Sequence, residues 1–386
     1  MEKVRYGIIG IGKMGSLHCL RFKYKLIKNG TLTAVCDISP ERRQWAEKNL
    51  PGVTFFEDYK ELMESGLVDA VLIATPHYLH PEMGKAALAR GLHTLIEKPA
   101  GVFTSAVREL NEAAKEKKGL VYGIMYNQRT NKLYRLAKTL IESGRLGEIK
   151  RINWIITDWY RPQAYYDQGG WRGTWVGEGG GALINQCPHQ LDLFQWLGGM
   201  PSKVIGYAKV GVKRNINVEN DVTAYFEYPN GATGVFITST HDFPGTNRLE
   251  IDADKGKLVI ENNKLTFTEL EVGETQFNAT NTKFMPKIPV KKKLVKRITK
   301  LGELSQFVTS QHTAILRNFT DAILYGKPLI APGEEGINGL TISNAIHLSS
   351  WTGQPVTLPI DEKLFEEELA KRIEEEKEFN KKKVQL

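Results

Sequence analysis

The sequence predicts an α/β protein with two domains: a doubly wound parallel sheet first, and then an α+β domain with an open, mainly antiparallel sheet. Three observations lead to this class. Short apolar runs alternate with helical patterns through the first 120 residues, the first run ends in a glycine-rich turn, and from about residue 148 the segments become β-rich. Continuous apolar strands that alternate with helices are typical of a parallel sheet covered on both faces.

The N-terminal elements follow one another in short steps. Buried strands are expected in the apolar runs 4–12, 32–37, 68–76, 93–99 and 120–129. Helices are expected in the segments 13–27, 39–50, 59–66, 81–91 and 105–119. Parallel strands need a crossover connection, which is usually a helix, so this alternation predicts a parallel sheet.

The C-terminal elements follow a different pattern. The segments 148–160, 203–213, 220–240 and 247–270 are β-rich, and Pro-Asn-Gly at 229–231 marks a hairpin turn. Helices are expected at 178–199, against this sheet, and near 307–325 and 334–351, and a solvated, charged helix from about 361. The expected division is a nucleotide-binding domain at 1–125, a domain for substrate and oligomer contacts at 126–360, and a charged C-terminal helix or tail at 361–386.

Composition excludes several classes of protein. The chain has 386 residues, enough for two cores, with 41% hydrophobic and 25% charged residues, as in ordinary globular proteins. No apolar run approaches the ~20 residues of a membrane span, and no signal-peptide pattern precedes the first strand. Three scattered cysteines, and the pair His77 and His80 without a third ligand, do not predict a metal site. We therefore expect a cytoplasmic protein without metal and without a membrane partner.

The net charge of +8 comes from one segment. No acidic residue lies between Glu274 and Glu303, and the basic residues in that gap equal the whole excess: Lys283, Lys287, Lys291, Lys292, Lys293, Lys296, Arg297 and Lys300. Aromatic residues do not alternate with these lysines, which argues against nucleic acid. A solvated loop is the simplest interpretation, and a surface for anionic partners or a neighbouring subunit is the alternative.

A dinucleotide-binding fingerprint follows the first apolar run. Gly10, Gly12 and Gly15 have the spacing Gly-x-Gly-x-x-Gly, with Lys13 and Met14 between the last two. The first glycine permits a tight turn, the second lets backbone N–H groups approach a pyrophosphate, and the third lets helix and strand pack closely. The helix N-terminus adds partial positive charge. These residues predict a Rossmann domain that binds a nicotinamide dinucleotide.

Asp37, at the end of the second expected strand, predicts which dinucleotide binds. A carboxylate at this place can bind both hydroxyls of the adenosine ribose and would repel a 2′-phosphate. The cofactor predicted is therefore NAD rather than NADP. Arg42 and Arg43 follow closely, and a cation there could weaken this preference.

A polar stripe follows the Glu-Gly-Gly-Gly sequence at 178–181. Asn185, His189, Asp192 and Trp196 recur at spacings of four, three and four, which places them on one face of a helix. Such a stripe is either a hydrogen-bonded seam in a core or one wall of an active site. Pro188 removes a helix hydrogen bond, so it kinks the segment or begins its regular part.

Three motifs in this order resemble one family. They are the fingerprint at 10–15, the segment 74–101 with Glu97-Lys98-Pro99, and the segment 178–199. Together they resemble the glucose–fructose oxidoreductase, inositol dehydrogenase and rhizopine catabolism (Gfo/Idh/MocA) family, from residue 4 to about residue 350. The resemblance implies a Rossmann domain, a C-terminal domain whose open sheet binds sugar and often mediates homo-oligomers, and pyridine-nucleotide chemistry on a carbohydrate or polyol hydroxyl.

The resemblance also implies roles for individual residues. The residues expected beside the nicotinamide half of the cofactor are Thr75, Pro76, His80 and Glu97. A Trp-Arg pair that contacts cofactor in sugar-oxidising relatives is matched by Trp171 and Arg172. The two catalytic positions fall on Lys98 and His189, with Asn185 as a third candidate. The residues expected to contact substrate are Asn127, Trp159, Asn185 and His189.

Asn185 departs from the family pattern, which commonly has an aspartate four residues before the histidine. An amide can orient a hydroxyl by donating and accepting hydrogen bonds, but it cannot take a proton. Oxidation of an alcohol needs a base for the hydroxyl proton and positive charge near the developing alkoxide. His189 would then be the base, because an imidazole titrates near neutral pH, and Lys98 would stabilise the alkoxide.

The segments around Trp171 and Asn185 resemble a subgroup that oxidises the C3 hydroxyl of a glycosyl unit to a ketone. Segment 154–175 is dense in aromatic residues that could stack on a sugar ring. We therefore expect an NAD-dependent sugar or glycoside dehydrogenase. The alternatives are an inositol or polyol dehydrogenase, an NAD-assisted glycosidase, and a non-enzymatic NAD-sensing regulator. The regulator should have lost Lys98 or His189, and both are present.

Overall fold

The computed structural model describes residues 2–168, 170–298 and 311–384. The chain divides into two compact units. Unit 1 takes the described residues of 1–130 and 306–340, and unit 2 takes those of 131–305 and 341–386. The chain therefore returns to unit 1 near its C-terminus, and this return has no counterpart in the division expected from the sequence.

Among its described residues, unit 1 contains a six-stranded sheet with the order β3-β2-β1-β4-β5-β6. Each neighbouring pair in this sheet is parallel. The strands are β1 (Val4–Ile9), β2 (Gly30–Cys36), β3 (Thr54–Phe56), β4 (Ala70–Ile73), β5 (His93–Ile96) and β6 (Tyr122–Ile124). The strand order reverses between β1 and β4, which is where doubly wound sheets bind dinucleotides. The predicted parallel sheet is confirmed.

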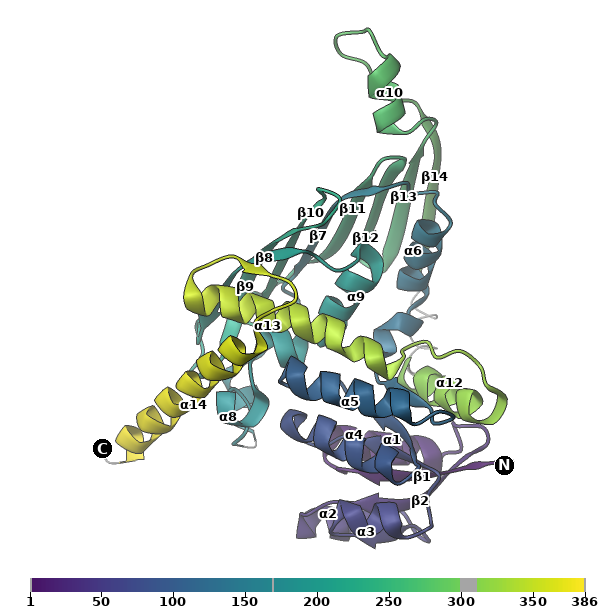
Figure 1. Ribbon diagram of the computed structural model, residues 1–386, viewed down its shortest axis with the longest axis vertical. Coiled ribbons are helices and arrows are strands. Elements are labelled where there is room, and N and C mark those ends of the chain that lie inside the picture. Colours follow the sequence, from purple (N-terminus) through teal and green to yellow (C-terminus); the bar gives the residue numbers. More distant parts are fainter. Residues whose placement is uncertain (1, 169, 299–310, 385–386) are drawn as a thin grey trace. The chain divides into compact units, whose positions relative to one another are not determined.

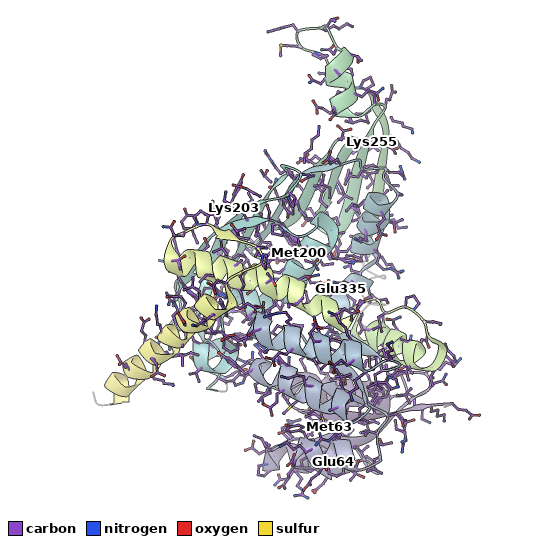
Figure 2. The ribbon with its side chains drawn as sticks, in the orientation of Figure 1. Met63, Glu64, Met200, Lys203, Lys255 and Glu335 are labelled. Atoms are coloured by element: carbon purple, nitrogen blue, oxygen red, sulfur yellow. The ribbon has the colours of Figure 1, made fainter. Side chains whose placement is uncertain are left out.

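Helices connect these strands (Figure 1). They are α1 (Lys13–Lys23), α2 (Pro40–Asn49), α3 (Tyr59–Glu64), α4 (His80–Ala89) and α5 (Thr104–Glu116). A helix from late in the chain, α12 (Gln311–Tyr325), connects no strands of this sheet but contacts β1. The short α3 shows why they cover the sheet: Met63 is buried in the core, whereas the next residue, Glu64, is exposed and pairs with Arg90 at 2.5 Å (Figure 2). The apolar face of α3 packs into the core, and burial of such faces against the strands stabilises the unit.

Specific polar contacts attach the late segment to unit 1. Arg129, in the 3₁₀ helix η2 (Asn127–Thr130), is 1% exposed and forms an ion pair with Glu335 in η4 (Gly333–Glu335), which Figure 2 labels. The hydroxyl groups of Tyr6 and Thr320 lie 2.7 Å apart in the core. A buried charge must be paired, so this ion pair fixes where the late segment joins the unit.

The described residues of unit 2 form a nine-stranded sheet with the order β14-β13-β12-β11-β7-β10-β9-β8-β15. The strands are β7 (Ile149–Ile156), β8 (Lys203–Val210), β9 (Glu219–Glu227), β10 (Thr233–Ser239), β11 (Asn247–Ala253), β12 (Gly256–Glu261), β13 (Lys264–Leu270), β14 (Val290–Arg297) and β15 (Val356–Thr357). Within these strands β7 and β10 are parallel to each other, and the other pairs are antiparallel. The predicted open, mainly antiparallel sheet is confirmed.

Two helices pack on the sheet of unit 2 and contact each other, α6 (Lys132–Glu142) and α9 (Pro188–Gly198) (Figure 1). The aromatic rings of Trp154, Phe194 and Phe236 pack together between α9 and the sheet. The ring centroid of Phe236 lies 5.7 Å from that of Phe194 and 6.4 Å from that of Trp154. Alternate residues of β9 are buried against these helices, among them Val222, as expected for a sheet with one covered face.

Further helices complete the chain: α7 (Gln163–Tyr166), α8 (Trp175–Glu178), α10 (Glu274–Thr280), α13 (Gly336–Thr352) and α14 (Glu362–Val384). The expectation of a simply solvated C-terminal helix is wrong for one face of α14. Phe365 and Leu369 are 1% and 0% exposed, and Glu376 is buried as well. That face packs within unit 2, because the Glu376 carboxylate accepts hydrogen bonds from Val176 N and Asn217 Nδ2.

The basic segment is also different from the solvated loop expected. Residues Val290–Arg297 form β14, an edge strand antiparallel to β13, and α10 projects beyond these two strands (Figure 1). The side chains of β14 remain largely exposed, and Lys291 lies 3.6 Å from Glu269. Lysines on an edge strand oppose pairing with another edge, which accounts for charge at this place. Lys300 lies outside the described residues.

In the part of the chain that the structure describes, no helix is both long enough and apolar enough to cross a membrane.

Candidate active site

The glycine fingerprint forms the turn between β1 and α1. Gly10 has φ +83°, and a Cβ there would lie 2.7 Å from Ala74 O; a Cβ on Gly15 would lie 1.9 Å from Gly10 O. A Cβ on Gly12 would meet nothing within 4 Å, and no side chain caps the N-terminus of α1. The first and third glycines are thus required by the fold, whereas the second leaves the helix N-terminus open to a phosphate group.

Asp37 follows β2 and holds the glycine turn. Its Oδ2 accepts a hydrogen bond from Ile11 N at 2.8 Å, and its Oδ1 accepts one from Ser39 N at 3.0 Å. Arg42 donates to Ser16 Oγ at 2.5 Å and covers the Trp45 ring at 4.9 Å. The carboxylate is therefore fixed beside the turn where the ribose of a dinucleotide would lie, and these residues fit the cofactor.

Glu97 is the centre of a buried network in unit 1. Its Oε1 lies 2.6 Å from His18 Nε2, its Oε2 accepts from Lys98 N at 3.1 Å, and the His18 ring meets the edge of the His312 ring. Burial alone would raise the pKa of Glu97, but the hydrogen bond and charge of His18, with the charges of His312 and Lys98, lower it to about 2. Burial lowers the pKa of His312 to about 4. Glu97 is therefore a buried carboxylate that fixes the main chain at Lys98.

His80 links the loops that follow β4 and β5. Its ring is 1% exposed, with Nδ1 2.7 Å from Pro99 O and Nε2 2.8 Å from Thr75 O. Burial lowers the pKa of His80, against the effect of these two carbonyl groups. Both ring nitrogens are occupied by main-chain atoms, so His80 positions Thr75, Pro76 and the segment of Lys98.

Asn127 is 5% exposed and lies in η2 of unit 1. Its Nδ2 is 3.3 Å from Gln311 Oε1 and 3.4 Å from His312 Nδ1. The start of α12 therefore joins Asn127 to the histidine that lies beside His18 and Glu97.

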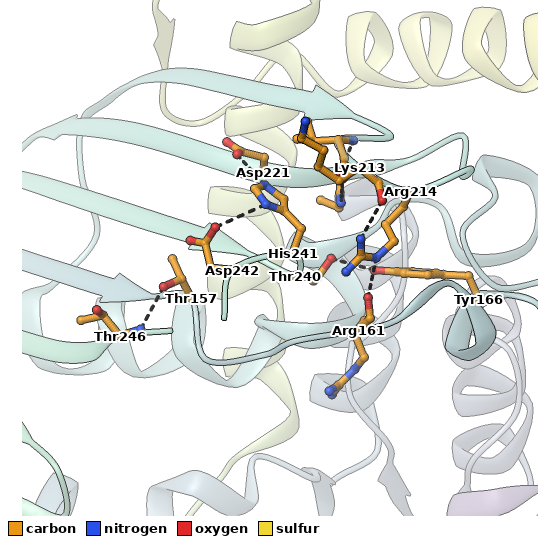
Figure 3. Close-up of polar contacts among 12 residues, drawn as sticks. Thr157, Arg161, Tyr166, Lys213, Arg214, Asp221, Thr240, His241, Asp242 and Thr246 are labelled. Atoms are coloured by element: carbon orange, nitrogen blue, oxygen red, sulfur yellow. Dashed lines mark hydrogen bonds and ion pairs between the residues drawn. The ribbon is translucent and has the colours of Figure 1, made fainter. Parts of the chain in front are cut away.

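In unit 2, the loop after β7 is tied to neighbouring strand ends (Figure 3). Thr157 Oγ1 accepts a hydrogen bond from Thr246 N at 3.0 Å. The carbonyl oxygen of Thr240 accepts one from Arg161 N at 2.8 Å. The Tyr166 hydroxyl lies 2.8 Å from Thr240 Oγ1. Loops become reliable platforms for ligands when a rigid sheet positions them.

Aromatic rings and guanidinium groups alternate along this loop. The guanidinium carbon of Arg161 lies 5.3 Å from the Trp159 ring and 5.0 Å from the Tyr165 ring. That of Arg172 lies 4.9 Å from the Tyr165 ring and 4.6 Å from the Trp171 ring. The five side chains form what we call the cation–aromatic row. Such contacts are worth about 0.5–2 kcal/mol each and hold the rings in place.

The segment 178–199 is not the single helix that its spacing predicts. Asn185 lies in a π-helical turn, η3 (Ala182–Gln186), in which Cys187 N donates to Ala182 O at 2.8 Å. Pro188 then begins α9, which carries His189. The polar stripe is therefore broken between Asn185 and His189. Hydrogen bonds in the turn of Asn185 join residues five apart, whereas those in α9 join residues four apart, so the two side chains do not follow one helical repeat.

The glycine run has a packing cause. A Cβ on Gly181 would lie 2.0 Å from Glu219 O. The Glu219 carboxylate accepts hydrogen bonds from Gly181 N at 2.8 Å and Leu183 N at 2.9 Å, and His347 Nε2 lies 3.0 Å from it. Glu219 thereby accepts hydrogen bonds from main-chain N–H groups that have no helical partner at the start of η3, and it fixes the turn that carries Asn185.

The members of the stripe have different surroundings. Asn185 and His189 are half-buried, and Asn185 Nδ2 donates to Glu178 Oε1. Asp192 is 1% exposed and accepts from Gln195 Nε2 at 3.0 Å, so it belongs to the core. Trp196 is covered by the Lys138 ammonium at 5.3 Å. The first half of the stripe is therefore partly accessible, whereas Asp192 in the second half belongs to a structural seam.

The predicted site residues fall into two groups. Most of those in unit 1 gather at the carboxyl ends of β1, β2, β4 and β5: Gly10, Gly12, Lys13, Met14, Gly15, Asp37, Thr75, Pro76, His80, Glu97 and Lys98. Asn127, also in unit 1, lies in η2 after β6. Those of unit 2 gather on the loop after β7 and around η3: Trp159, Trp171, Arg172, Asn185 and His189. Among the described residues, no group of three or more histidines, cysteines and acids is arranged to hold a metal ion.

Sequence reasoning missed three side chains that shape the site, His18, His312 and Glu178. His18 comes three residues after Gly15, so it faces the same side of α1, and this spacing could have found it. Glu178 precedes the glycine run and was visible only as part of that motif. Nothing in the sequence indicates His312, because its partners come from distant segments: Asn127 lies 185 residues earlier, and His18 lies near the start of the chain.

A two-unit chain with an open dinucleotide turn on a parallel sheet, followed by a polar site on an antiparallel sheet, has the form of a nicotinamide-dependent oxidoreductase. Two family models match the chain: an oxidoreductase family with an NAD-binding Rossmann fold matches residues 4–124, and the GFO/IDH/MocA C-terminal domain matches residues 134–259. Together they match more than half of the 386 residues. The chain belongs to the Gfo/Idh/MocA family of NAD-binding oxidoreductases.

Individual relatives agree with this assignment. A myo-inositol 2-dehydrogenase of Thermotoga maritima is 25% identical over 264 residues, 67% of this chain and 75% of the relative. A levoglucosan dehydrogenase of Pseudarthrobacter phenanthrenivorans is 25% identical over 292 residues, 67% of this chain and 74% of the relative. The crystal structure of the WlbA dehydrogenase of Bordetella pertussis, in complex with NADH and UDP-GlcNAcA, is 26% identical, with a TM-score of 0.75 over 93% of this chain and all of that one.

Proposed function

We propose that this protein is an NAD-dependent dehydrogenase that oxidises a secondary hydroxyl of a sugar or glycoside, the C3 hydroxyl of a glycosyl unit, to a ketone. The observation that carries the proposal is the cation–aromatic row beside η3. Gln186 Nε2 in η3 donates to the Tyr165 hydroxyl of this row at 3.3 Å, so ring faces and polar groups belong to one surface. Sugar rings present apolar C–H faces and polar edges, and such a surface suits both.

The relatives support the same class of substrate. Their names include dehydrogenases of myo-inositol and of levoglucosan, and the WlbA structure holds NADH with UDP-GlcNAcA. An inositol or other polyol therefore remains the competing substrate class. The assignment of C3 comes from the resemblance of the segments around Trp171 and Asn185 to the glycoside-oxidising subgroup.

The residues around the glycine turn would hold NAD. Gly12 and the N-terminus of α1 would bind the pyrophosphate, and Asp37 would bind the adenosine ribose. The residues proposed for the nicotinamide half are Thr75, Pro76, His80, Glu97, Trp171 and Arg172; of these, His80 and Glu97 would act through the loops they fix. NAD, when bound, accepts a hydride from the alcohol carbon.

The side chains of this chain would perform the rest of the reaction. The His189 imidazole would take the hydroxyl proton while the C–H bond breaks, leaving the ketone. The Lys98 ammonium would donate to the substrate oxygen and stabilise its developing negative charge. Asn185 would hold a neighbouring hydroxyl and so select which carbon reacts, with Asn127 and Trp159 as further substrate contacts.

A substrate panel tests this proposal. The purified protein is incubated with NAD and with matched sets of methyl glycosides, free sugars and myo-inositol, and NADH formation is followed by absorbance. Carbon-13 NMR of the product then locates the new carbonyl group. NADH formation with a 3-keto glycoside supports the proposal. Turnover of myo-inositol alone assigns the polyol class instead, and release of an aglycone without net NADH assigns an NAD-assisted glycosidase.

We also propose that the nine-stranded sheet forms a homo-oligomer through its outer face. Large side chains on three strands in the middle of the sheet are exposed, with β10 lying between β7 and β9: Ile155 on β7 by 37%, Tyr225 on β9 by 39% and Tyr207 on β8 by 66%. Size-exclusion chromatography with light scattering tests this, and Tyr207→Glu should lower the mass observed. A monomer at all concentrations would contradict it.

A further inference from the structure

A buried carboxyl group lies behind Asn185. Glu178 is the last residue of α8 and is 1% exposed. Its Oε2 accepts a hydrogen bond from Gly173 N at 2.7 Å, and its Oε1 accepts one from Asn185 Nδ2. A carboxyl group therefore lies a single hydrogen bond away from Asn185.

Charged groups surround Glu178 on several sides. Arg172 approaches from the loop before α8, and Glu219, which pairs with His347 of α13, approaches from β9. Glu376 of α14 binds the N–H group of Val176 on the same short helix. Burial raises the pKa of Glu178 to about 7, with Glu219 acting in the same direction and Gly173, Arg172 and Asn185 against it. Both protonation states of the carboxyl group are therefore populated near neutral pH.

The two states make different demands on the amide of Asn185. An ionised carboxylate only accepts hydrogen bonds, so it holds the Nδ2 group and leaves Oδ1 turned away from it. A protonated carboxyl group can donate, and it then matches an amide turned by 180°, with Oδ1 toward Glu178 and Nδ2 turned away. The protonation of Glu178 thus determines whether Asn185 presents an acceptor or a donor on its other side.

We propose that Glu178 is a positioning residue, which in its ionised form orients Asn185 so that Oδ1 accepts a hydrogen bond from a substrate hydroxyl. This inference rests on the proposed function only in the statement that Asn185 faces substrate. The carboxylate of Glu178 lies behind Asn185, where it orients the amide and does not take the proton. Substrate affinity should then depend on the ionisation of Glu178, separately from the catalytic base.

Kinetics of Glu178→Gln test the role. In the wild type, KM for the sugar should fall as pH rises through about 7. In the variant that pH dependence should disappear, and KM at pH 8 should rise about tenfold, the size expected for one lost hydrogen bond to substrate. The dependence of kcat on the ionisation of His189 should remain. Unchanged KM and an unchanged pH profile in Glu178→Gln would overturn the proposal.

Two further variants separate orientation from general damage. Glu376→Gln alters another buried acid, which lies on α14 and accepts hydrogen bonds from Val176 N of α8 and from Asn217 Nδ2, and it should keep the pH dependence of KM. Loss of that dependence in Glu376→Gln as well would count against a specific role of Glu178. The double variant Glu178→Gln with Asn185→Asp exchanges amide and carboxylate. It should recover pH-dependent KM, because one acid again faces one amide; failure to recover it contradicts the proposal.

A measurement without substrate keeps the inference independent of the proposed function. In protein labelled with carbon-13 at glutamate carboxyl groups, one NMR resonance should titrate near pH 7, and it should be missing in Glu178→Gln. The amide protons of Asn185 should shift with the same midpoint. A titrating Glu178 without any response at Asn185 overturns the positioning role. Absence of NAD-dependent turnover on every sugar and polyol, with this titration intact, overturns the proposed function instead.

Discussion

His18 and Glu97 join the helix that follows the glycine turn to the segment that carries Lys98. His18 Nε2 lies 2.6 Å from Glu97 Oε1, and both side chains are buried, at 0% and 5% exposure of the residue. The second carboxylate oxygen of Glu97 accepts from Lys98 N. One hydrogen-bonded pair therefore connects the expected phosphate site with the expected catalytic lysine, both within unit 1.

The first prediction concerns acid stability. Glu97 has a pKa of about 2 in the folded chain, below the ordinary 4.5, so the unfolded chain binds more protons in that interval. The resulting stabilisation is present above pH 4.5 and is lost as pH falls towards 2, and it amounts to about 3 kcal/mol at ~1.4 kcal/mol per pKa unit. Glu97→Gln should therefore be less stable than the wild type at pH 7, with a difference that narrows towards pH 3, measured by urea unfolding.

The matched control is Glu109→Gln. Glu109 also has a lowered pKa, caused by its hydrogen bond with Lys85, but the side chain is 66% exposed. Solvent screens such a pair, so the free energy of unfolding of Glu109→Gln should stay close to that of the wild type at every pH. The prediction fails if the free energies of unfolding of the wild type and Glu97→Gln differ by the same amount down to pH 3. In that case the pair of Glu97 and His18 does not stabilise the fold through the ionisation of Glu97.

The second prediction concerns the cofactor. Asp37 is fixed by Ile11 N and Ser39 N, so its negative charge stays where a 2′-phosphate would lie. We expect NAD to bind at least about 100-fold more tightly than NADP, and Asp37→Asn to reduce this ratio to less than about tenfold. Calorimetric titration measures both affinities. Glu57→Gln, which alters an exposed acid paired with Arg43, should leave the ratio unchanged; equal wild-type affinities would contradict the prediction.

The sequence predicted the elements of unit 1 well because their signals are local. The strand β4 is fully buried, and an uninterrupted apolar run of this kind predicts a central strand of a parallel sheet. The return of α12 to unit 1 could not be predicted in the same way. Apolar spacing shows that a helix buries one face, but the partner of that face, such as Tyr6 for Thr320, comes from a distant segment.

Local signals also identify part of the candidate site. Asn185, His189 and Lys98 are recognisable because each lies in a motif. The π-helical turn could not be predicted, because a spacing of four, three and four fits an ordinary α-helix and the five-residue bond of Cys187 depends on how Glu219 holds the turn. The role of Glu178 depends on burial, which its own sequence neighbourhood does not determine.

The third prediction separates His189 from Asn185. If the imidazole is the base, His189→Ala should remove the ascending limb of the pH profile of kcat and lower kcat by about 100-fold or more. Asn185→Ala should raise KM and broaden the choice of hydroxyl, while it keeps that limb, since an amide does not titrate. Initial rates across pH measure both. An ascending limb that survives in His189→Ala would assign the base to another residue.

The fourth prediction concerns the stability effect of Glu178. Its pKa of about 7 lies above the ordinary 4.5, so between these values the folded chain binds more protons than the unfolded chain, and stability falls as pH rises. Glu178→Gln removes this loss. The variant should therefore gain stability relative to the wild type from pH 5 to pH 8, by up to about 3 kcal/mol. Urea unfolding at pH 5 and at pH 8 measures the free energy of unfolding of the variant minus that of the wild type. A value that stays constant or falls between these two pH values would contradict the prediction.

The last prediction concerns Lys98, on which the enzyme mechanism depends most. The ammonium should matter chiefly for the alkoxide-like transition state and much less for the neutral alcohol that binds first, and such interactions appear in turnover. Lys98→Met keeps the length of the side chain and removes the charge. Loss of one preorganised donor of this kind costs ~100- to 1,000-fold in rate, so kcat should fall by that factor.

Binding of NAD separates this effect from damage to the site. Lys98 N is held by Glu97, and that bond uses the main chain, so Lys98→Met should keep the loop in place. The affinity for NAD should therefore change by less than about tenfold, and the melting temperature should stay close to that of the wild type. Calorimetric titration and thermal unfolding check both points. Near-normal turnover of Lys98→Met on a verified substrate would disprove the proposed role of the lysine, because no other group has been assigned to the alkoxide.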